Sequence, residues 1–160
     1  MHTLNALPGD KAAAYEELAT QLQALLSGEH DLVANAANMA ALLFWSLPDL
    51  NWAGFYRMVE GELVLGPFQG KPACIRIPMG RGVCGTAAAT RQTQLVEDVH
   101  AFPGHIACDA ASASEVVVPI IAEGDLIGVL DLDSPLPARF DAIDARALER
   151  LMAAVASRLR

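Results

Sequence analysis

The stretch EVVVPIIAEGDLIGVLDLDS, residues 115–134, holds two apolar segments separated by a polar turn. Residues 115–122 and 126–132 are rich in valine, isoleucine and leucine, which suit strands. Between them, Glu123-Gly124-Asp125 provides a turn with a central glycine, as in connections between antiparallel strands. The stretch therefore predicts a β-hairpin.

The rest of the chain adds helices and shorter strands to this hairpin. Helical spacing of apolar residues predicts helices over residues 11–26, 31–46 and 141–159. Alternating segments predict strands over residues 51–59, 62–65, 74–77 and 94–96, and a tight turn at residues 80–82 leads into a short helix through residues 86–89. We expect the last helix to face inward with Ile143, Leu148, Leu151, Met152 and Val155. Residues 101–114 follow neither period and predict a long loop, a feature that is often functional. Together these elements predict one α+β domain over residues 1–160, with a central, mainly antiparallel sheet flanked by helices.

Composition and charge exclude several classes of partner. The net charge is −8, and no stripe of lysine and arginine is present that would contact a phosphate backbone. The longest apolar stretch, residues 36–47, is shorter than the roughly 20 residues needed to cross a bilayer, and the N-terminus lacks a signal-peptide pattern. We therefore expect a cytoplasmic protein with no nucleic-acid or membrane partner. The apolar helix around residues 36–47 is compatible with a homodimer.

Three cysteines are the first candidates for chemistry. Thiols stay reduced in the cytosol, and three cannot all pair internally, so reactivity or burial is expected. Cys108 lies in the predicted loop among polar residues, where a thiolate is accessible, and is the best candidate nucleophile. Cys84 begins the short helix, whose positive dipole end would lower its pKa, so it is a rival reactive thiol. Cys74 lies at a predicted strand start and is equally suited to the core.

A metal site is not expected from the spacing of these residues. His105 lies close to Cys108, which raises the idea of zinc held together with Cys74 and Cys84. The chain has no CxxC or HxxxH pair of the kind that zinc sites use. We therefore expect no metal and no cofactor.

Acidic side chains form a second group of candidates. Asp131 and Asp133 are two residues apart on a strand and so share one face, about 7 Å apart by strand rise. They are either a strand end in solvent or a buried pair that meets a cation. In the second case, like charge and burial would raise one pKa and keep that carboxyl protonated as an acid. Glu115, at the start of the adjoining strand, would complete the cluster.

Aromatic and glycine-rich segments suggest how a small ligand would be enclosed. Trp52 and Tyr56 are four residues apart on a predicted strand and face the same side, either as core or as the wall of a pocket. Gly80-Arg81-Gly82-Val83 at a helix start offers backbone N–H groups to a carboxylate. With acids opposite, these features describe a pocket for a zwitterionic amino acid.

Several segments in order resemble the free methionine-(R)-sulfoxide reductase family, which has the GAF-type fold. They are NWAGFY at 51–56, LGPFQGK at 65–71, GRGVCGT at 80–86, EDVH at 97–100, HIACDAAS at 105–112, SEV at 114–116 and GVLDLDS at 128–134. The resemblance spans about residues 51–134, and all three cysteines lie within it.

The resemblance implies roles for these residues. Cys108 would attack the sulfoxide sulfur and become a sulfenic acid, and Cys74 would resolve it through a Cys74–Cys108 disulfide that thioredoxin reduces. Glu115, Asp131 and Asp133 would contact free methionine sulfoxide or assist the chemistry. From the chemistry of the substrate, we expect Asp131 to hold the ammonium and Asp133 to act as the acid. Trp52 and Tyr56 would wall the S-methyl group, and Cys84 stays an additional redox candidate.

A different class of function also fits the predicted fold. A GAF domain can act as a sensory module that binds a small ligand without catalysis. Three cysteines beside an acidic cluster favour the reductase, because a sensor does not need them. Consumption of a reductant when sulfoxide is supplied would separate the two.

Overall fold

The computed structural model describes residues 4–106 and 109–160. Its elements are α1 (Lys11–Leu25), α2 (Leu32–Ser46), β1 (Trp52–Val59), β2 (Glu62–Gly70), β3 (Arg76–Pro78), α3 (Gly82–Thr90), β4 (Gln94–Val96), β5 (Ser114–Ala122), β6 (Asp125–Ser134) and α4 (Ala142–Val155), with 3₁₀ turns at Val99–Ala101 and Ala156–Arg158. None of the helices in this described part of the chain is long and apolar enough to cross a membrane.

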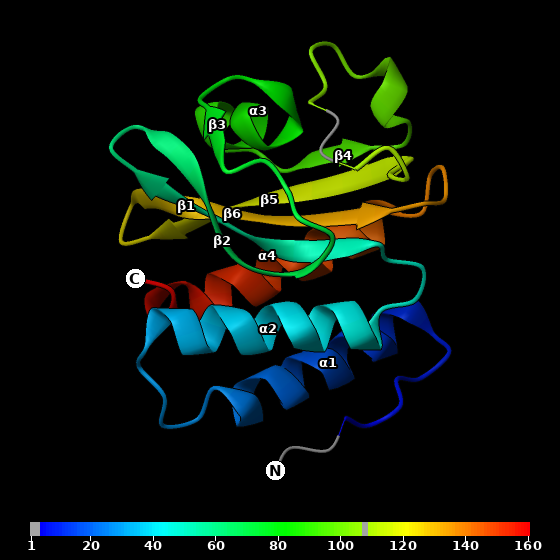
Figure 1. The fold of residues 1–160 in the computed structure, drawn as a ribbon. Helices are drawn as coiled ribbons and strands as arrows, with labels where there is room; N and C mark the ends of the chain where they lie inside the picture. Colours follow the sequence, from blue (N-terminus) through cyan, green and yellow to red (C-terminus); the bar gives the residue numbers. More distant parts are fainter. Residues whose placement is uncertain (1–3, 107–108) are drawn as a thin grey trace.

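The strands form one six-stranded sheet in the order β3-β2-β1-β6-β5-β4, and every neighbouring pair is antiparallel. Helices α2 and α4 cover one face of the sheet, and α1 packs against both of them from outside (Figure 1). Helix α3 and the segment that leads to β5 lie over the other face (Figure 1). The predicted α+β architecture, with a mainly antiparallel sheet flanked by helices, is confirmed.

Side-chain caps explain where the outer helices begin. The Asp10 carboxylate accepts a hydrogen bond from the Ala13 N–H at 2.9 Å, and Asp31 accepts one from Ala34 at 2.8 Å. Such caps satisfy amides that have no partner inside the helix. These starts lie within one residue of those predicted from the spacing of apolar residues.

Two predicted strand boundaries and one predicted inward-facing residue are wrong. The strand expected to end at Leu65 continues to Gly70, because β1 pairs with it as far as Trp52 opposite Gly70. The strand expected over residues 74–77 begins only at Arg76, so Cys74 precedes it in a loop. Ile143, expected to face inward, is 41% exposed on the first turn of α4, whereas the other four predicted inward residues are buried.

The sheet separates two apolar clusters by strict alternation along its central strands. Phe55, Val116 and Leu130 face the helical layer of α1, α2 and α4. Trp52 and Val129 face the opposite side, toward α3. Because successive side chains of a strand point to opposite faces, polar residues in step with Val129 must also lie beneath α3.

The central strands approach each other closely at Gly128. A methyl group added there would lie 2.2 Å from the carbonyl oxygen of Tyr56 on β1, which is too close for any unchanged backbone. We expect Gly128→Ala to lower the free energy of unfolding by about 1–3 kcal/mol or more, as overpacking does. Chemical denaturation measures this. Gly9→Ala, where an added methyl group meets nothing within 4 Å, is the control and should change little.

Candidate active site

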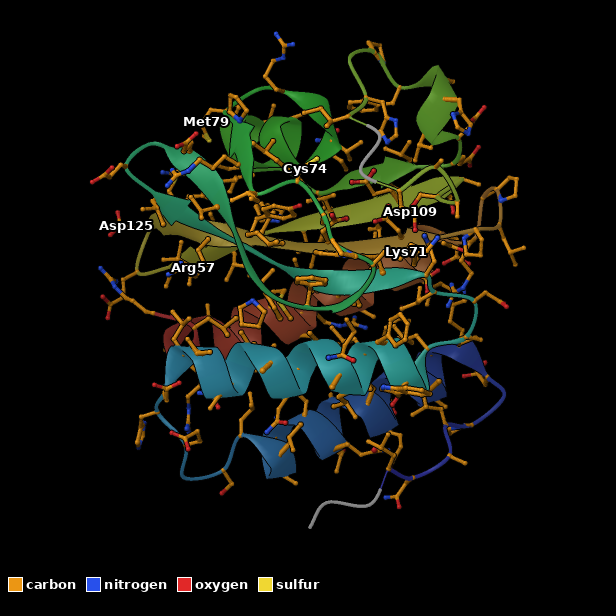
Figure 2. All side chains as sticks on the ribbon, in the orientation of Figure 1. Arg57, Lys71, Cys74, Met79, Asp109 and Asp125 are labelled. Carbon is orange, nitrogen blue, oxygen red and sulfur yellow. The ribbon has the colours of Figure 1, made fainter. Side chains whose placement is uncertain are left out.

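A pocket lies on the face of the sheet beneath α3. Strands β1, β5 and β6 form its floor, and the start of α3 forms one wall. Residues 71–73, 105–106, 109 and 112 contribute to its rim. Figure 2 shows Cys74 on the α3 side of the sheet and Lys71 next to Asp109 at one edge, where their side chains form an ion pair at 3.8 Å. The pocket therefore joins several of the predicted site residues from distant parts of the chain.

The register of β5 and β6 brings the three predicted acids together. Glu115 is paired directly with Asp133, and Val117 with Asp131, so the three carboxyl groups share the pocket face. Glu115 is 6% exposed and Asp131 is 7% exposed, while Asp133 is half-buried. The interpretation of Asp131 and Asp133 as a strand end in solvent is wrong, since β6 continues to the buried Ser134.

Burial raises the pKa values of all three acids, and the charge of Asp131 adds to the shift of the other two. For Glu115 and Asp133, loss of solvent is the first cause and the charge of Asp131 the next, and both pKa values lie well above the ordinary range. Burial also raises the pKa of Asp131, to about 6, while hydrogen bonds with Cys84 and Glu115 hold it down. Near neutral pH, Asp131 is therefore the member of the cluster that carries the negative charge most readily.

Cys84 lies against this cluster instead of facing solvent. Its Sγ atom is 3.3 Å from Asp131 Oδ2 and 3.9 Å from Glu115 Oε1, and the residue is 4% exposed. The prediction that the helix start lowers its pKa is wrong: burial, and then the charges of Asp131 and Glu115, raise the pKa of the thiol well above its ordinary value. The resting group is a thiol that donates to Asp131.

The aromatic wall is also part of the packed core. Trp52 and Tyr56 are stacked with ring centroids 6.0 Å apart. Phe68 also stacks on Trp52, with ring centroids 5.2 Å apart. Both Trp52 and Tyr56 line the pocket and are 2% exposed. The Tyr56 hydroxyl donates to the backbone carbonyl of Cys74 at 3.0 Å, which ties the loop before β3 to the pocket floor.

Cys108, the predicted nucleophile, lies outside the described residues. The segment that follows it is attached to the sheet by Asn51, whose side-chain amide donates to Asp109 at 3.2 Å and to Ser112 at 3.0 Å. Asp109 and Ser112 both line the pocket. This attachment holds Asp109 and Ser112 at the rim of the pocket.

Three further features bear on ligands. His105 Nε2 is 3.8 Å from Glu115 Oε2, and burial, with the charge of His100, lowers the pKa of His105. One ligand atom each from Cys84, Glu115 and Asp131 lies within 4.8 Å of the others, an arrangement in which a metal ion would fit. Arg81, Gly82 and Val83 at the start of α3 line the pocket, as predicted for a carboxylate subsite.

Comparison with known proteins assigns this chain to a family. A family model for the GAF domain matches residues 33–160. The free methionine-R-sulfoxide reductase of Escherichia coli (strain K12) is 54% identical over 144 residues, which cover 90% of this chain and 87% of that protein. The Saccharomyces cerevisiae protein of the same name is 45% identical over 150 residues, which cover 89% of this chain and 83% of that protein.

A solved structure agrees with these relatives. The X-ray structure of the free methionine-R-sulfoxide reductase from Neisseria meningitidis in complex with its substrate has a TM-score of 0.95 at 48% identity, covering 99% of this chain and 96% of that one. This chain belongs to the free methionine-R-sulfoxide reductase family of GAF domains. The resemblance read from the sequence is confirmed, and the family is one of oxidoreductases.

Sequence reasoning missed part of the site of this family member. Asn51 and Ser112 are 61 residues apart, and no spacing rule connects a strand-edge amide with a loop hydroxyl. Phe68 was not predicted to join the wall, because the strand that carries it was expected to end before it. Alternation along a longer β2 would have been the signal for Phe68.

The buried acids make a prediction about stability and pH. Because the pKa of Asp131 is raised in the folded state, the stability that its proton provides is present below about pH 4 and is lost as the pH rises through about 6. Asp131→Asn cannot ionise, so at pH 8 we expect it to be more stable than the wild type by about 1–3 kcal/mol. The advantage should shrink toward pH 4.

Thermal unfolding of both proteins from pH 4 to pH 8 measures the effect. Glu16→Gln, a substitution of an exposed acid on α1, is the control and should follow the wild type at both ends. If Asp131→Asn were less stable than the wild type at pH 8, the interpretation that the ionised Asp131 carboxylate destabilises the folded protein would be wrong.

Proposed function

We propose that this protein reduces free methionine-(R)-sulfoxide to methionine with Cys108 as the nucleophile and thioredoxin as the reductant. The observation that carries the proposal is a trio of carboxyl groups, two buried and one half-buried, that lines one pocket together with Trp52 and Tyr56. Relatives at 54% and 45% identity bear the name of this activity, and two related structures contain substrate. We also propose a single cytoplasmic domain that works without a cofactor.

The pocket suits the separate parts of the substrate. Asp131 is the carboxylate that ionises most readily, so it is suited to accept the ammonium group. The stacked rings of Trp52 and Tyr56 offer an apolar surface to the S-methyl group. Backbone N–H groups at the start of α3, where Arg81 caps the helix without a side-chain bond, would receive the substrate carboxylate.

The chemistry divides between thiols and acids. The Cys108 thiolate forms a bond to the sulfoxide sulfur, and the oxygen is protonated as electrons move onto sulfur. Asp133 and Glu115, whose pKa values are raised, hold a proton for this step near neutral pH. The hydroxyl then passes from the substrate sulfur to the Cys108 sulfur as the bond between the two sulfur atoms breaks, so methionine leaves reduced by two electrons and Cys108 becomes a sulfenic acid. Attack by the Cys74 thiol on this sulfenic acid releases water and forms the disulfide. Thioredoxin supplies the two electrons that restore both thiols.

The structure favours Cys74 over Cys84 as the resolving thiol. Cys84 is buried with a pKa raised by burial and by two acids, which disfavours the thiolate needed for attack. Cys74 lies in the loop before β3, at the α3 side of the sheet (Figure 2).

The protein would also form a homodimer through α2. Two large apolar side chains of this helix, Val33 and Trp45, are exposed and available for such a contact.

Turnover by cysteine variants tests the proposed function. Reduced protein with thioredoxin should consume reductant with free methionine-(R)-sulfoxide, and Cys108→Ser should abolish this while the fold is kept. Cys74→Ser should release about one equivalent of methionine per enzyme and then stall, because no intramolecular disulfide forms. Assays with each sulfoxide epimer measure both.

Three outcomes would change the proposal. A tenth or more of the activity in Cys108→Ser would exclude it as nucleophile. Steady turnover in Cys74→Ser with loss in Cys84→Ser would transfer the resolving role. Binding of the sulfoxide by the wild type without any consumption of reductant would favour a sensory module.

Separate kinetic signatures are expected for the two aspartates. Asp133→Asn should lower kcat by about 100-fold or more, because proton transfer matters only in the transition state. Asp131→Asn should raise KM by about 10- to 150-fold, the equivalent of ~1.5–3 kcal/mol for a charge-assisted hydrogen bond. Steady-state kinetics near pH 7 measure both.

A matched control exists on the same strand. Asp125→Asn lies at the opposite end of β6, exposed and away from the pocket (Figure 2), and should leave kcat and KM unchanged. Near-normal kinetics in both pocket variants would place the chemistry elsewhere.

A further inference from the structure

Three potential metal ligands converge in the pocket from three elements. Cys84 of α3, Glu115 of β5 and Asp131 of β6 each present one ligand atom, and these atoms all lie within 4.8 Å of one another. In tetrahedral zinc sites, Zn–S is about 2.3 Å and Zn–O about 2.0 Å, so sulfur and oxygen ligands lie about 3.5 Å apart. The observed sulfur–oxygen distances of 3.3 and 3.9 Å lie on either side of that value. Little movement would be needed to bind the ion.

Asp131 also presents an atom that lacks a partner. Its Oδ1 is buried and makes no hydrogen bond to any residue that the structure describes, and the side chain lines the pocket. A buried carboxylate oxygen without a partner is costly, and a cation removes that cost. This atom is a second, independent sign that the pocket is built to receive a positive group.

The donor types select the kind of cation. Magnesium and calcium prefer sites made of oxygen ligands alone, whereas a thiolate with carboxylates suits a borderline-soft ion such as zinc. His105 is suitably located for a fourth ligand, since its Nε2 is 3.8 Å from Glu115 Oε2. Its imidazole is a good zinc ligand in the neutral form. The alternative fourth ligand is water.

We propose that Cys84, Glu115 and Asp131 form a zinc-binding site, and that zinc bound there blocks the pocket reversibly. On binding, the ion replaces the proton of the Cys84 thiol and the proton held by Glu115, both of which pass to the solvent, and no electrons are transferred. The inhibition rests on the proposed function, because zinc would occupy the place given above to the substrate ammonium. The binding itself does not depend on turnover.

The sequence expectation of no metal followed from spacing alone. No short sequence motif contains the three ligands, because 31 positions separate Cys84 from Glu115 and 16 separate Glu115 from Asp131. The sheet register and the packing of α3 on β5 and β6 bring them together. Short ligand spacings therefore do not describe this type of site.

Zinc binding is tested on reduced Cys74→Ser/Cys108→Ser protein, in which Cys84 is the only thiol. Titration of Zn²⁺ against a chromophoric chelator should give one tight site per chain. Adding Cys84→Ser should weaken it by about 100-fold or more, since loss of a direct ligand exceeds the 10- to 100-fold typical of outer partners. Asp131→Asn should weaken it as well, and His30→Gln, an exposed control, should not.

Two further measurements use the same protein. Co²⁺ in place of zinc should give a thiolate charge-transfer band that Cys84→Ser abolishes, whereas Mg²⁺ and Ca²⁺ at equal concentration should not compete. Free methionine sulfoxide should weaken zinc binding in proportion to its occupancy of the pocket. Equal zinc affinity with and without Cys84, or an absence of stoichiometric binding, would overturn the proposal.

The outcomes separate this proposal from the proposed function. Zinc binding that depends on Cys84 in a protein that does not reduce the sulfoxide would refute the function and keep the site. Turnover in the wild type that is insensitive to a saturating concentration of zinc would refute inhibition at the pocket. If zinc inhibited the wild type and Cys84→Ser with equal potency, Cys84 would be refuted as a ligand.

Discussion

The antiparallel pairing of β5 with β6 places Glu115 directly opposite Asp133, with Asp131 two residues away on the same face. The same register sends Val116 and Leu130 into the core beneath the helical layer. A slip of one residue would exchange these sets, so that acids would enter the apolar core and leucines would line the pocket. Burial of the apolar face therefore fixes the positions of the acids, and the site needs no separate device to hold its geometry.

This arrangement brings acidic groups close together, although electrostatic repulsion alone would keep them apart. Like charges directly opposite on neighbouring strands repel, and burial strengthens the repulsion. The cluster is tolerable because burial favours the protonated forms of Glu115 and Asp133, because Cys84 donates to Asp131, and because Ser112 interacts with Asp133. The free energy needed comes from the well-packed face on the other side of the sheet. Strain of this kind, with its loss of stability, is common where a site must receive a charged ligand.

Period-two alternation was sufficient to predict much of this site. It placed Asp131 and Asp133 on one face and made Glu115 their neighbour, because a hairpin with a short turn leaves little freedom of register. The family resemblance agreed with the pocket that resulted, although it left residue roles as proposals, and Cys108 lies outside the described residues. The predicted helices succeeded for a similar reason, since Asp10 and Asp31 cap them through local bonds.

The wrong predictions came from rules that consider only neighbouring residues, at positions where tertiary contacts decide the outcome. The helix-start argument for Cys84 considered only its own helix, whereas its pKa depends on acids 31 and 47 residues away. The end of β2 was placed too early, directly before Gly66 and Pro67, whereas pairing with β1 continues the strand past them. In both cases the contacts that decide the outcome, the two acids beside Cys84 and strand β1 beside β2, come from distant parts of the sequence.

The two oxygens of Asp131 show how one acid can serve both a thiol and an incoming cation. Oδ2 receives the Cys84 thiol at 3.3 Å, and Oδ1 has no hydrogen-bond partner among the described residues. An ammonium group needs only an acceptor, so it can use Oδ1 and leave the thiol bond intact. A zinc ion gains most from the thiolate and must displace the proton that Cys84 shares with Oδ2. The thiol proton therefore favours the amino acid over the metal, and the selectivity of the pocket depends on the bond between Cys84 and Asp131.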